Sequence, residues 1–131
     1  MPVVIDASAM VELLLRTSVG GAVGRLLRRR AVAAPSHLDA EVLSALGRLH
    51  RASEVSEGRV GSALEALARA PITRYLLAPL LEEAWGARDT LALPDALYVV
   101  LARRLGANLV TTDARLAAAP GLGISVTVAR G

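Results

Sequence analysis

The sequence predicts a single α/β domain over residues 1–131, in which a central, mostly parallel sheet is doubly wound by flanking helices. Three observations predict this fold class. Short runs rich in β-branched residues alternate with longer segments whose apolar residues recur every three or four positions. Gly and Pro stand at the junctions between them. The length and the hydrophobic fraction of 53% suit one compact core, and no repeat or linker divides the chain.

The first part of the chain predicts a strand, two helices and a second strand. Residues 3–5 are three consecutive β-branched residues and form the first expected strand. A helical pattern covers 9–16, and the next helix, 18–30, carries an apolar stripe at helical spacing. The second strand is expected at 31–34, because Pro35 interrupts strand pairing.

The middle of the chain predicts two longer helices, a strand and a further helix. Ser36 is the expected N-cap of the first of these helices. The second covers 56–70 and ends before Pro71, which cannot continue it. A strand follows at 72–76 and a helix at 79–88.

The last third of the chain predicts a helix, a strand, a short helix and a final strand. The helix opens at Pro94, a first-turn position where proline fits, and ends at Gly106, a favourable residue just past a helix. The strand at 108–112, the helix at 114–119 and the strand at 124–128 complete the pattern. Strands separated by helices in this way favour a parallel sheet.

Two of the five Asp residues follow strands directly. Asp6 comes at the end of the first strand, and Asp113 comes at the end of the fourth. In an open parallel sheet, ligands bind beyond the carboxyl ends of the strands. We therefore expect both carboxylates at one edge of the sheet.

The lengths of the elements place two further acids at the same edge. From Asp95 to Leu105 the helix runs about 15 Å away from this edge of the sheet, and the strand at 108–112 returns about 16 Å toward it. Asp95 and Asp113 are therefore expected at the same edge. Glu41 lies roughly 8 Å into a helix that starts from that edge. Four carboxylates in one cleft repel one another, and a cation relieves the repulsion. With oxygen ligands and no Cys, Mg²⁺ or Mn²⁺ fits best.

Each acid taken alone also has an ordinary structural explanation. Asp95 suits the first turn of a helix, and Glu41 could be an exposed helix charge. Asp6 or Asp113 could close an Asx turn. Four independent structural roles that all happen to lie at one edge are a weaker explanation than one shared site. The sequence therefore favours a shared site.

Composition narrows the chemistry further. All fifteen basic residues are Arg, and the chain has neither Lys nor Cys. This excludes a P-loop lysine, a Schiff base and a thiolate nucleophile. The net charge of +3 weakly favours a polyanionic partner. No apolar stretch reaches the ~20 residues of a membrane span, and no secretory signal is seen, so a cytoplasmic protein is expected.

Other conspicuous side chains receive simpler interpretations. His37 and His50 are expected on the surface, and Trp85 in the core. The arginine-rich stretch 25–30 is interpreted as a solvated helix end. Arg48, two turns beyond Glu41, is a candidate phosphate contact near the acids.

The segments "VVIDAS", "DAEVLSAL" and "LPDALYVVLARRLGANLVTTDARLA" resemble the PIN domains, and among them the VapC toxins of bacterial toxin–antitoxin pairs. The likeness runs over essentially the whole chain. It implies a PIN-like fold and a ribonuclease that uses one or two Mg²⁺ or Mn²⁺ ions to hydrolyse RNA. The acids that match its metal ligands are Asp6, Glu41, Asp95 and Asp113. Ser8 and Thr112 match hydroxyl positions that support the first and last of these acids.

The resemblance also implies partners: a VapB-type antitoxin that blocks the metal site, and a second copy of the toxin in a homodimer. The first two helices carry more apolar residues than one buried face needs, so a groove lined by Met10, Leu14 and Leu27 would accept a partner helix. Two departures from the family are visible. Ser44 stands where such toxins often carry Asn, and 114–116 lacks an acid that some relatives have, which leaves the number of metals open.

Two other functions stay open at this point. A non-catalytic PIN-like module that binds RNA or protein would share the fold, although such a module has no physical need to hold four acids together. An aspartyl-phosphate phosphotransfer domain would use Asp6 as its nucleophile, but those families place a Lys near the site and this chain has none. Titration with metal separates these functions.

Overall fold

Five parallel strands form one sheet, and the computed structural model describes residues 1–131. The strands are β1 Val3–Ile5, β2 Val32–Pro35, β3 Ile72–Tyr75, β4 Asn108–Thr111 and β5 Val126–Val128. Their order across the sheet is β3-β2-β1-β4-β5, and every neighbouring pair is parallel. The predicted α/β class with a central parallel sheet is therefore confirmed.

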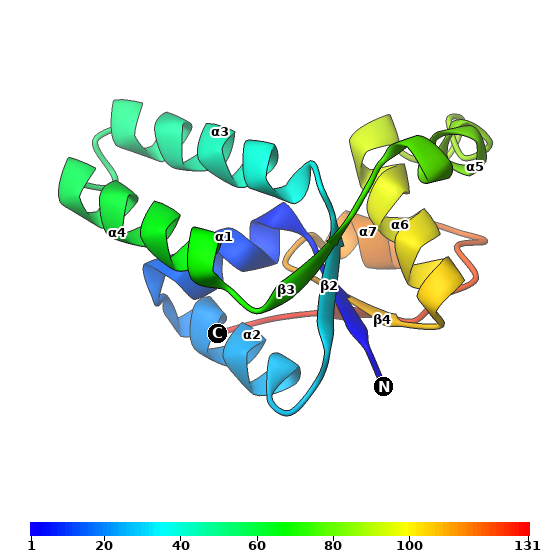
Figure 1. Cartoon of the computed structure of the whole chain (residues 1–131), viewed down its shortest axis with the longest axis horizontal. Coiled ribbons are helices and arrows are strands. Elements are labelled where there is room, and N and C mark those ends of the chain that lie inside the picture. The colour runs from blue at the N-terminus through cyan, green and yellow to red at the C-terminus, as the bar shows by residue number, and fades with distance from the viewer.

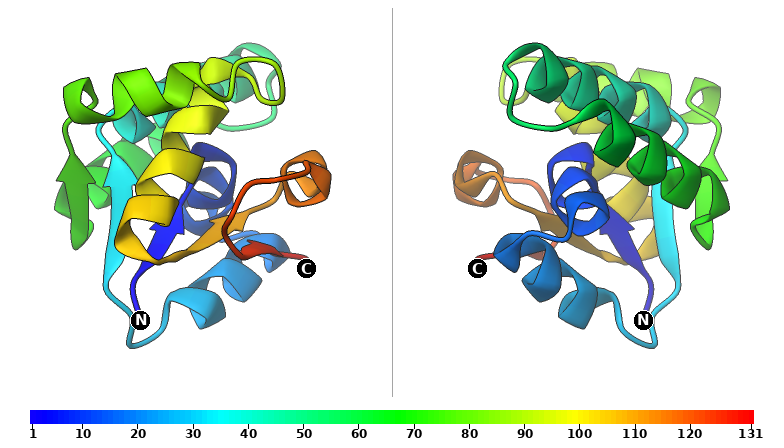
Figure 2. Two further views of the ribbon diagram at one scale, coloured as in Figure 1. Left: turned by 90° about the vertical axis from the view of Figure 1, so that its right-hand side faces the viewer. Right: turned by 90° about the vertical axis from the view of Figure 1, so that its left-hand side faces the viewer.

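Seven α-helices and one 3-10 turn connect the strands. They are α1 Ala7–Leu15, α2 Ser18–Leu27, α3 Leu38–Arg51, α4 Glu57–Arg69, η1 Ala78–Leu80, α5 Leu81–Trp85, α6 Leu93–Leu105 and α7 Ala114–Ala118. In the two views of Figure 2, α6 lies on one face of the sheet, and α1 and α2 lie on the other. Helices α3 and α4 pack on α1 and project beyond the sheet (Figure 1). The sheet is doubly wound, as predicted.

The strand order places a crevice between β1 and β4. From β1 the chain proceeds to β2 on one side, whereas β4, the neighbour of β1 on the other side, proceeds to β5. Where the strand order reverses in this way, the connections leave toward opposite faces and a crevice opens at the carboxyl ends of the strands. Asp6 follows β1 and Asp113 follows β4 at this point.

The core is centred on the sheet and α6, and buried residues of α1 to α4 complete it. All three residues of β1 are buried, and so are seven consecutive residues of α6, from Ala96 to Ala102. A helix that is apolar all round is a buried helix, which explains why α6 contacts β1, β2 and β4. No helix in the structure has the length and apolar character that crossing a membrane requires.

The predicted cap at Ser36 is wrong. Helix α3 begins at Leu38, and its N-cap position is held by His37, which makes no side-chain capping hydrogen bond. The reason is that the sheet extends further than expected. Strand β2 includes Pro35, and the backbone N–H of Ser36 donates to the carbonyl oxygen of Tyr75 at 2.8 Å. Ser36 thus continues the strand pairing rather than capping the helix.

Trp85 does not lie in the core, and the prediction that placed it there is wrong. The single helix expected at 79–88 is a 3-10 turn followed by the five-residue α5, and Trp85 ends α5 with 58% of its surface exposed. The guanidinium carbon of Arg88 lies 4.8 Å from the centre of a Trp85 ring. An indole that reaches the surface in this way is available to a partner.

Candidate metal centre

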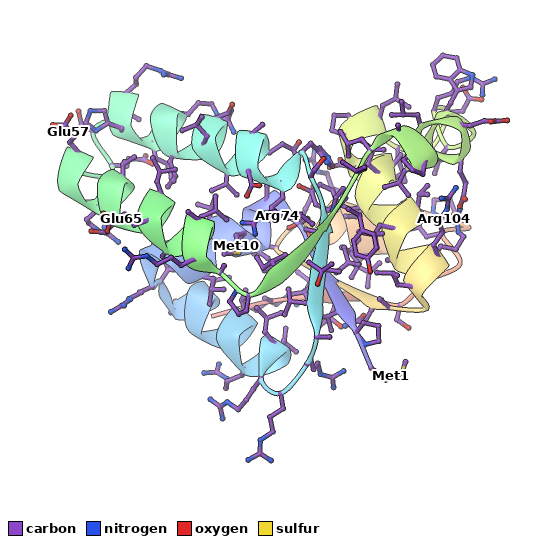
Figure 3. All side chains as sticks on the ribbon, in the orientation of Figure 1. Met1, Met10, Glu57, Glu65, Arg74 and Arg104 are labelled. Atoms are coloured by element: carbon purple, nitrogen blue, oxygen red, sulfur yellow. The ribbon has the colours of Figure 1, made fainter.

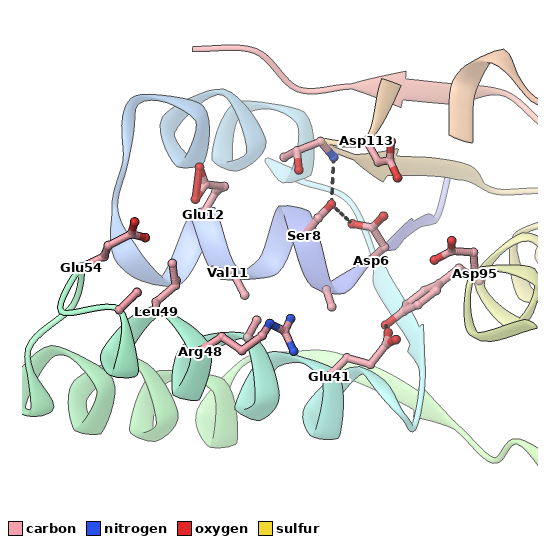
Figure 4. Close-up of a pocket in the computed structure, with 15 residues that line it drawn as sticks. Asp6, Ser8, Val11, Glu12, Glu41, Arg48, Leu49, Glu54, Asp95 and Asp113 are labelled. Carbon is pink, nitrogen blue, oxygen red and sulfur yellow. Dashed lines mark hydrogen bonds between the residues drawn. The ribbon is translucent and has the colours of Figure 1, made fainter. Parts of the chain in front are cut away.

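The four acids selected from the sequence line one cleft of about 610 Å³ (Figure 4). Asp6 follows β1, Glu41 lies in the first turn of α3, Asp95 in the first turn of α6, and Asp113 follows β4. These four positions all lie at the carboxyl edge of the sheet, where the strand order reverses. The fold therefore brings together the four side chains that the sequence placed at one edge.

Asp6 is the most deeply buried of the four acids and is held by three donors. The Ser8 hydroxyl and the backbone N–H of Ala9 donate to its Oδ1 at 2.7 and 3.0 Å, and the Thr111 hydroxyl donates to its Oδ2. The bond to Ala9 also caps the N-terminus of α1. Burial raises the pKa of Asp6, and the hydrogen bonds only partly offset this. A nearby cation would favour its charged form.

The supporting hydroxyls are Ser8 and Thr111, whereas the sequence pointed to Ser8 and Thr112. Thr111 is fully buried at the end of β4, and its Oγ1 also accepts a hydrogen bond from the backbone N–H of Asp113 at 3.0 Å. Thr112 lines the cleft, and its contact to Ser8 is made by its backbone N–H at 3.1 Å. Side chains alternate along a strand, so a shift of one residue decides which threonine faces Asp6.

Asp95 and Asp113 have opposite electrostatic surroundings. The pKa of Asp95 is raised by burial first and then by the charges of Glu41, Asp6 and Asp113. The pKa of Asp113 is lowered, chiefly by Arg115, whose guanidinium donates to both carboxylate oxygens at 3.2 and 3.3 Å. The cleft thus contains mutually repelling carboxylates, one of which is already paired with a cation from its own chain.

Glu41 is oriented by two residues that the sequence did not single out for this purpose. The Tyr98 hydroxyl donates to its Oε1 at 2.7 Å, and Nε2 of His37 lies 3.6 Å from the same oxygen. The His37 side chain is only 14% exposed, so its predicted surface position is wrong. Its ring packs against Tyr98 with 4.7 Å between centroids, because α3 starts directly beside α6. The spacing of Tyr98 and Asp95, one turn apart on α6, is the signal that could have identified Tyr98.

Arg48 lies further along the same cleft, where the sequence predicted a phosphate contact. It is exposed on α3, on the wall of the cleft opposite α1 (Figure 4). Glu12 and Glu54 line the end of the cleft away from the four acids, and no local sequence pattern predicts this. The lining therefore places one basic side chain between two acidic regions.

The donor chemistry of the cleft fits a hard divalent cation, but the side chains are not arranged as a finished cage. No three His, Cys, Asp or Glu side chains are close enough together to hold a metal ion as they stand. Three of the four carboxylates are instead turned toward protein donors: Asp6 toward Thr111, Glu41 toward Tyr98 and Asp113 toward Arg115. Oxygen ligands suit a hard divalent cation, and such a cation would relieve the like-charge repulsion that Glu41, Asp6 and Asp113 exert on Asp95. Binding it requires side-chain rotation, above all by Asp113.

Residues 3–122 match the PIN domain family. The chain is 57% identical over 118 residues to Ribonuclease VapC3 of Mycobacterium tuberculosis, and this alignment covers 89% of the chain and 86% of that relative. It is 41% identical over 129 residues to Ribonuclease VapC1 of the same organism, which covers 97% of each.

Two solved structures have the same fold. The crystal structure of VapC20 of Mycobacterium tuberculosis, a toxin that cleaves the sarcin-ricin loop, matches with a TM-score of 0.68 at 19% identity and covers 88% of this chain and 93% of that one. VapBC2 from Rickettsia felis, bound to a DNA fragment from its promoter, matches with a TM-score of 0.70 at 14% identity and covers 98% of each chain. At these identities the likeness concerns the fold alone.

Proposed function

The chain belongs to the PIN domain family, in its VapC-type branch, and from this premise we propose that it is a metal-dependent ribonuclease that hydrolyses RNA phosphodiester bonds in the carboxylate cleft. One observation carries the proposal. Asp6, Glu41, Asp95 and Asp113 come from four separate elements and line a single cleft at the switch point of the sheet. The names of the VapC relatives, all ribonucleases, support the substrate class.

The proposed roles follow from what each side chain contacts. The four acids would hold one or two Mg²⁺ or Mn²⁺ ions, which supply a water of lowered pKa as the nucleophile. Ser8 and Thr111 fix the two oxygens of Asp6 and so fix the direction in which its remaining lone pairs point. Arg48 is exposed on the cleft wall and is placed to bind a phosphate of the RNA strand.

Removal of metal is expected to abolish RNA cleavage by the purified chain. Excess EDTA should stop cleavage, and added Mg²⁺ or Mn²⁺ should restore it, because without a cation the cleft repels the phosphate backbone. The measurement is the appearance of cleaved RNA ends on a denaturing gel, with a metal-independent ribonuclease in the same buffer as the control. Cleavage that continues undiminished in excess chelator would refute the proposal.

We propose a VapB-type antitoxin as the protein partner, docked in a groove between α1 and α4. The groove has a volume of about 1020 Å³, and Met10 and Leu14 of α1 line it beside α4. Met10 is labelled in Figure 3. Leu27 does not line it, so that part of the expected groove is wrong, because α2 turns away from α4. The charged residues of the lining are Arg16, Arg59 and Arg69, without any acid. This favours a partner helix whose apolar face is flanked by Asp or Glu.

We also propose that the chain forms a homodimer through the exposed apolar patch around α5. The patch consists of Leu81, Trp85 and Leu93, which are three of the seven large hydrophobic side chains that the structure exposes. All three line one apolar hollow, which His37 and Leu97 also line. Exposed apolar residues concentrated in one place are typical of an interaction surface. We choose a second copy of the chain as the partner for this patch, because a second copy is present wherever the protein is made.

A charge in this patch is expected to convert the dimer to a monomer. Leu81→Glu should halve the mass measured by light scattering after gel filtration, because a carboxylate would be buried in an apolar interface. Leu43→Glu is the matched control, since Leu43 is 56% exposed and Leu81 is 54% exposed. A Leu81→Glu protein that keeps the mass of the parent dimer would show that this patch is not the interface.

A further inference from the structure

Tyr98 and His37 lie behind Glu41 and connect it to the start of α6. Tyr98 is buried among the apolar residues of α6, and its hydroxyl meets Oε1 of Glu41 on α3. Nε2 of His37 lies 3.0 Å from the carbonyl oxygen of Pro94, the residue before Asp95. Tyr98 and His37 therefore connect Glu41 on α3 to the first turn of α6, which carries Asp95.

The hydroxyl of Tyr98 is not required by the packing of α6. The neighbouring buried positions of this helix are filled by Ala, Val and Leu, and a phenyl ring would occupy the same volume as the phenol. Glu41 does not need the bond for its own solvation either, because its side chain is 34% exposed and reaches water. What the bond does is restrict a flexible side chain with three rotatable bonds to one orientation at the cleft.

The pair is built to keep this orientation. A carboxylate oxygen can only accept, so the Tyr98 hydroxyl is the donor in its 2.7 Å hydrogen bond to Glu41. A carbonyl oxygen accepts, so Nε2 of His37 carries the proton that is donated to Pro94. The other ring nitrogen, Nδ1, is then the one buried side-chain polar atom without a partner. The ring is held there in spite of that cost, packed against Tyr98 with the two ring planes tilted by 40°.

We propose that Tyr98 and His37 are positioning residues, which fix one oxygen of Glu41 relative to Asp95 so that its other oxygen is presented to a divalent cation. This inference depends on the proposed function of the cleft. Side chains that orient metal ligands in this way typically change metal affinity by roughly 10- to 100-fold when they are removed. His37 acts through Tyr98, by packing against the phenol ring and holding the first turn of α6.

The test measures Mn²⁺ binding directly, by the electron paramagnetic resonance signal of free Mn²⁺ during titration of the full chain. Tyr98→Phe is expected to weaken binding by roughly 10- to 100-fold. Tyr75→Phe, at the only other tyrosine, should bind as the parent does. In a Glu41→Gln background, Tyr98→Phe should have no further effect, because the ligand through which Tyr98 acts is already lost.

Three outcomes would overturn the inference, and they are distinguishable. If the parent binds no Mn²⁺, the metal site itself is wrong. If the parent binds and Tyr98→Phe binds equally well, the cleft function stands and the positioning role is wrong. If Tyr98→Phe weakens binding as much in the Glu41→Gln protein as in the parent, Tyr98 acts through general packing and not through Glu41.

A second measurement does not depend on the folding of the Tyr98 variant. In the Tyr75→Phe protein, Tyr98 is the only tyrosine, so a ¹³C label at its Cζ gives one assigned signal. Saturating Mg²⁺ is expected to shift that signal, since a cation on Glu41 withdraws charge from the oxygen that accepts the Tyr98 proton. A signal that stays in place while Mg²⁺ binds would contradict the proposed link.

Discussion

Asp95→Asn is expected to reduce the rate of RNA cleavage by roughly a thousandfold or more, since a metal ion contributes several kcal/mol to the transition state and each ~1.4 kcal/mol is tenfold in rate. Asp95 lines the cleft together with the other three acids, and the charges of Glu41, Asp6 and Asp113 all raise its pKa. Asparagine keeps the shape of the side chain and removes the charge. The measurement is the rate of cleavage of one RNA at saturating Mg²⁺.

The same variant is expected to unfold at a higher denaturant concentration than the parent in metal-free buffer at neutral pH. The pKa of Asp95 is raised in the folded state, so its ionised form destabilises the fold. That destabilisation is absent below the ordinary Asp pKa and complete above the folded-state pKa. The advantage of Asp95→Asn should therefore shrink as the pH falls through this window. Added Mg²⁺ should stabilise the parent and reverse the order.

Asp89→Asn is the matched control for both measurements. Asp89 is exposed, lies outside the cleft and is separated from Asp95 by only five residues. It should cleave RNA as the parent does and gain no stability in metal-free buffer. If Asp95→Asn keeps full activity, Asp95 is not a ligand. If it loses activity by unfolding at neutral pH, the repulsion argument is wrong.

Leu14→Glu is expected to weaken the complex with the cognate antitoxin by about a hundredfold, which corresponds to roughly 3 kcal/mol. Leu14 is half-buried in the groove between α1 and α4. A carboxylate there removes an apolar anchor, and it repels the acidic flank that the three arginines of the groove favour. The dissociation constant can be measured by calorimetry with the antitoxin, and metal binding by the variant should be unchanged.

Leu27→Glu serves as the control for this prediction. Leu27 is also half-buried in the first pair of helices, but it lies on α2 and outside the groove. Its variant should bind the antitoxin as tightly as the parent once its own folding has been verified by thermal unfolding. Tight binding by Leu14→Glu, or a larger loss with Leu27→Glu, would place the antitoxin on a different surface.

The sequence predicted the fold and the positions of the acids because both follow from local patterns. Apolar runs, Gly106 and Pro71 give the elements, and the rule that ligands meet the carboxyl ends of parallel strands gives the edge. Asp95 and Asp113 could even be brought level by adding the rise of one helix and one strand. These inferences need no knowledge of contacts between distant segments.

The supporting residues could not be predicted in this way, because their contacts join distant segments. Thr111 and Asp6 are 105 positions apart, and Tyr98 and Glu41 are 57 apart. Indoles are usually buried, so the sequence predicts Trp85 in the core, yet large apolar side chains also make up much of a protein surface. The contact of His37 with Tyr98 depends on the extension of β2 through Pro35, and no local sequence pattern predicts that extension.

Anomalous diffraction from a crystal soaked in Mn²⁺ tests the central claim most directly, since it locates the ion without any assumption about its ligands. The proposed site predicts one or two peaks within the cleft, each at roughly 2.1–2.2 Å from carboxylate oxygens of at least two of the four acids. It also predicts that Asp113 has turned from Arg115 toward the ion and that Tyr98 still donates to Glu41. A crystal with Mn²⁺ bound elsewhere, or with no peak in the cleft at saturating Mn²⁺, would contradict the account.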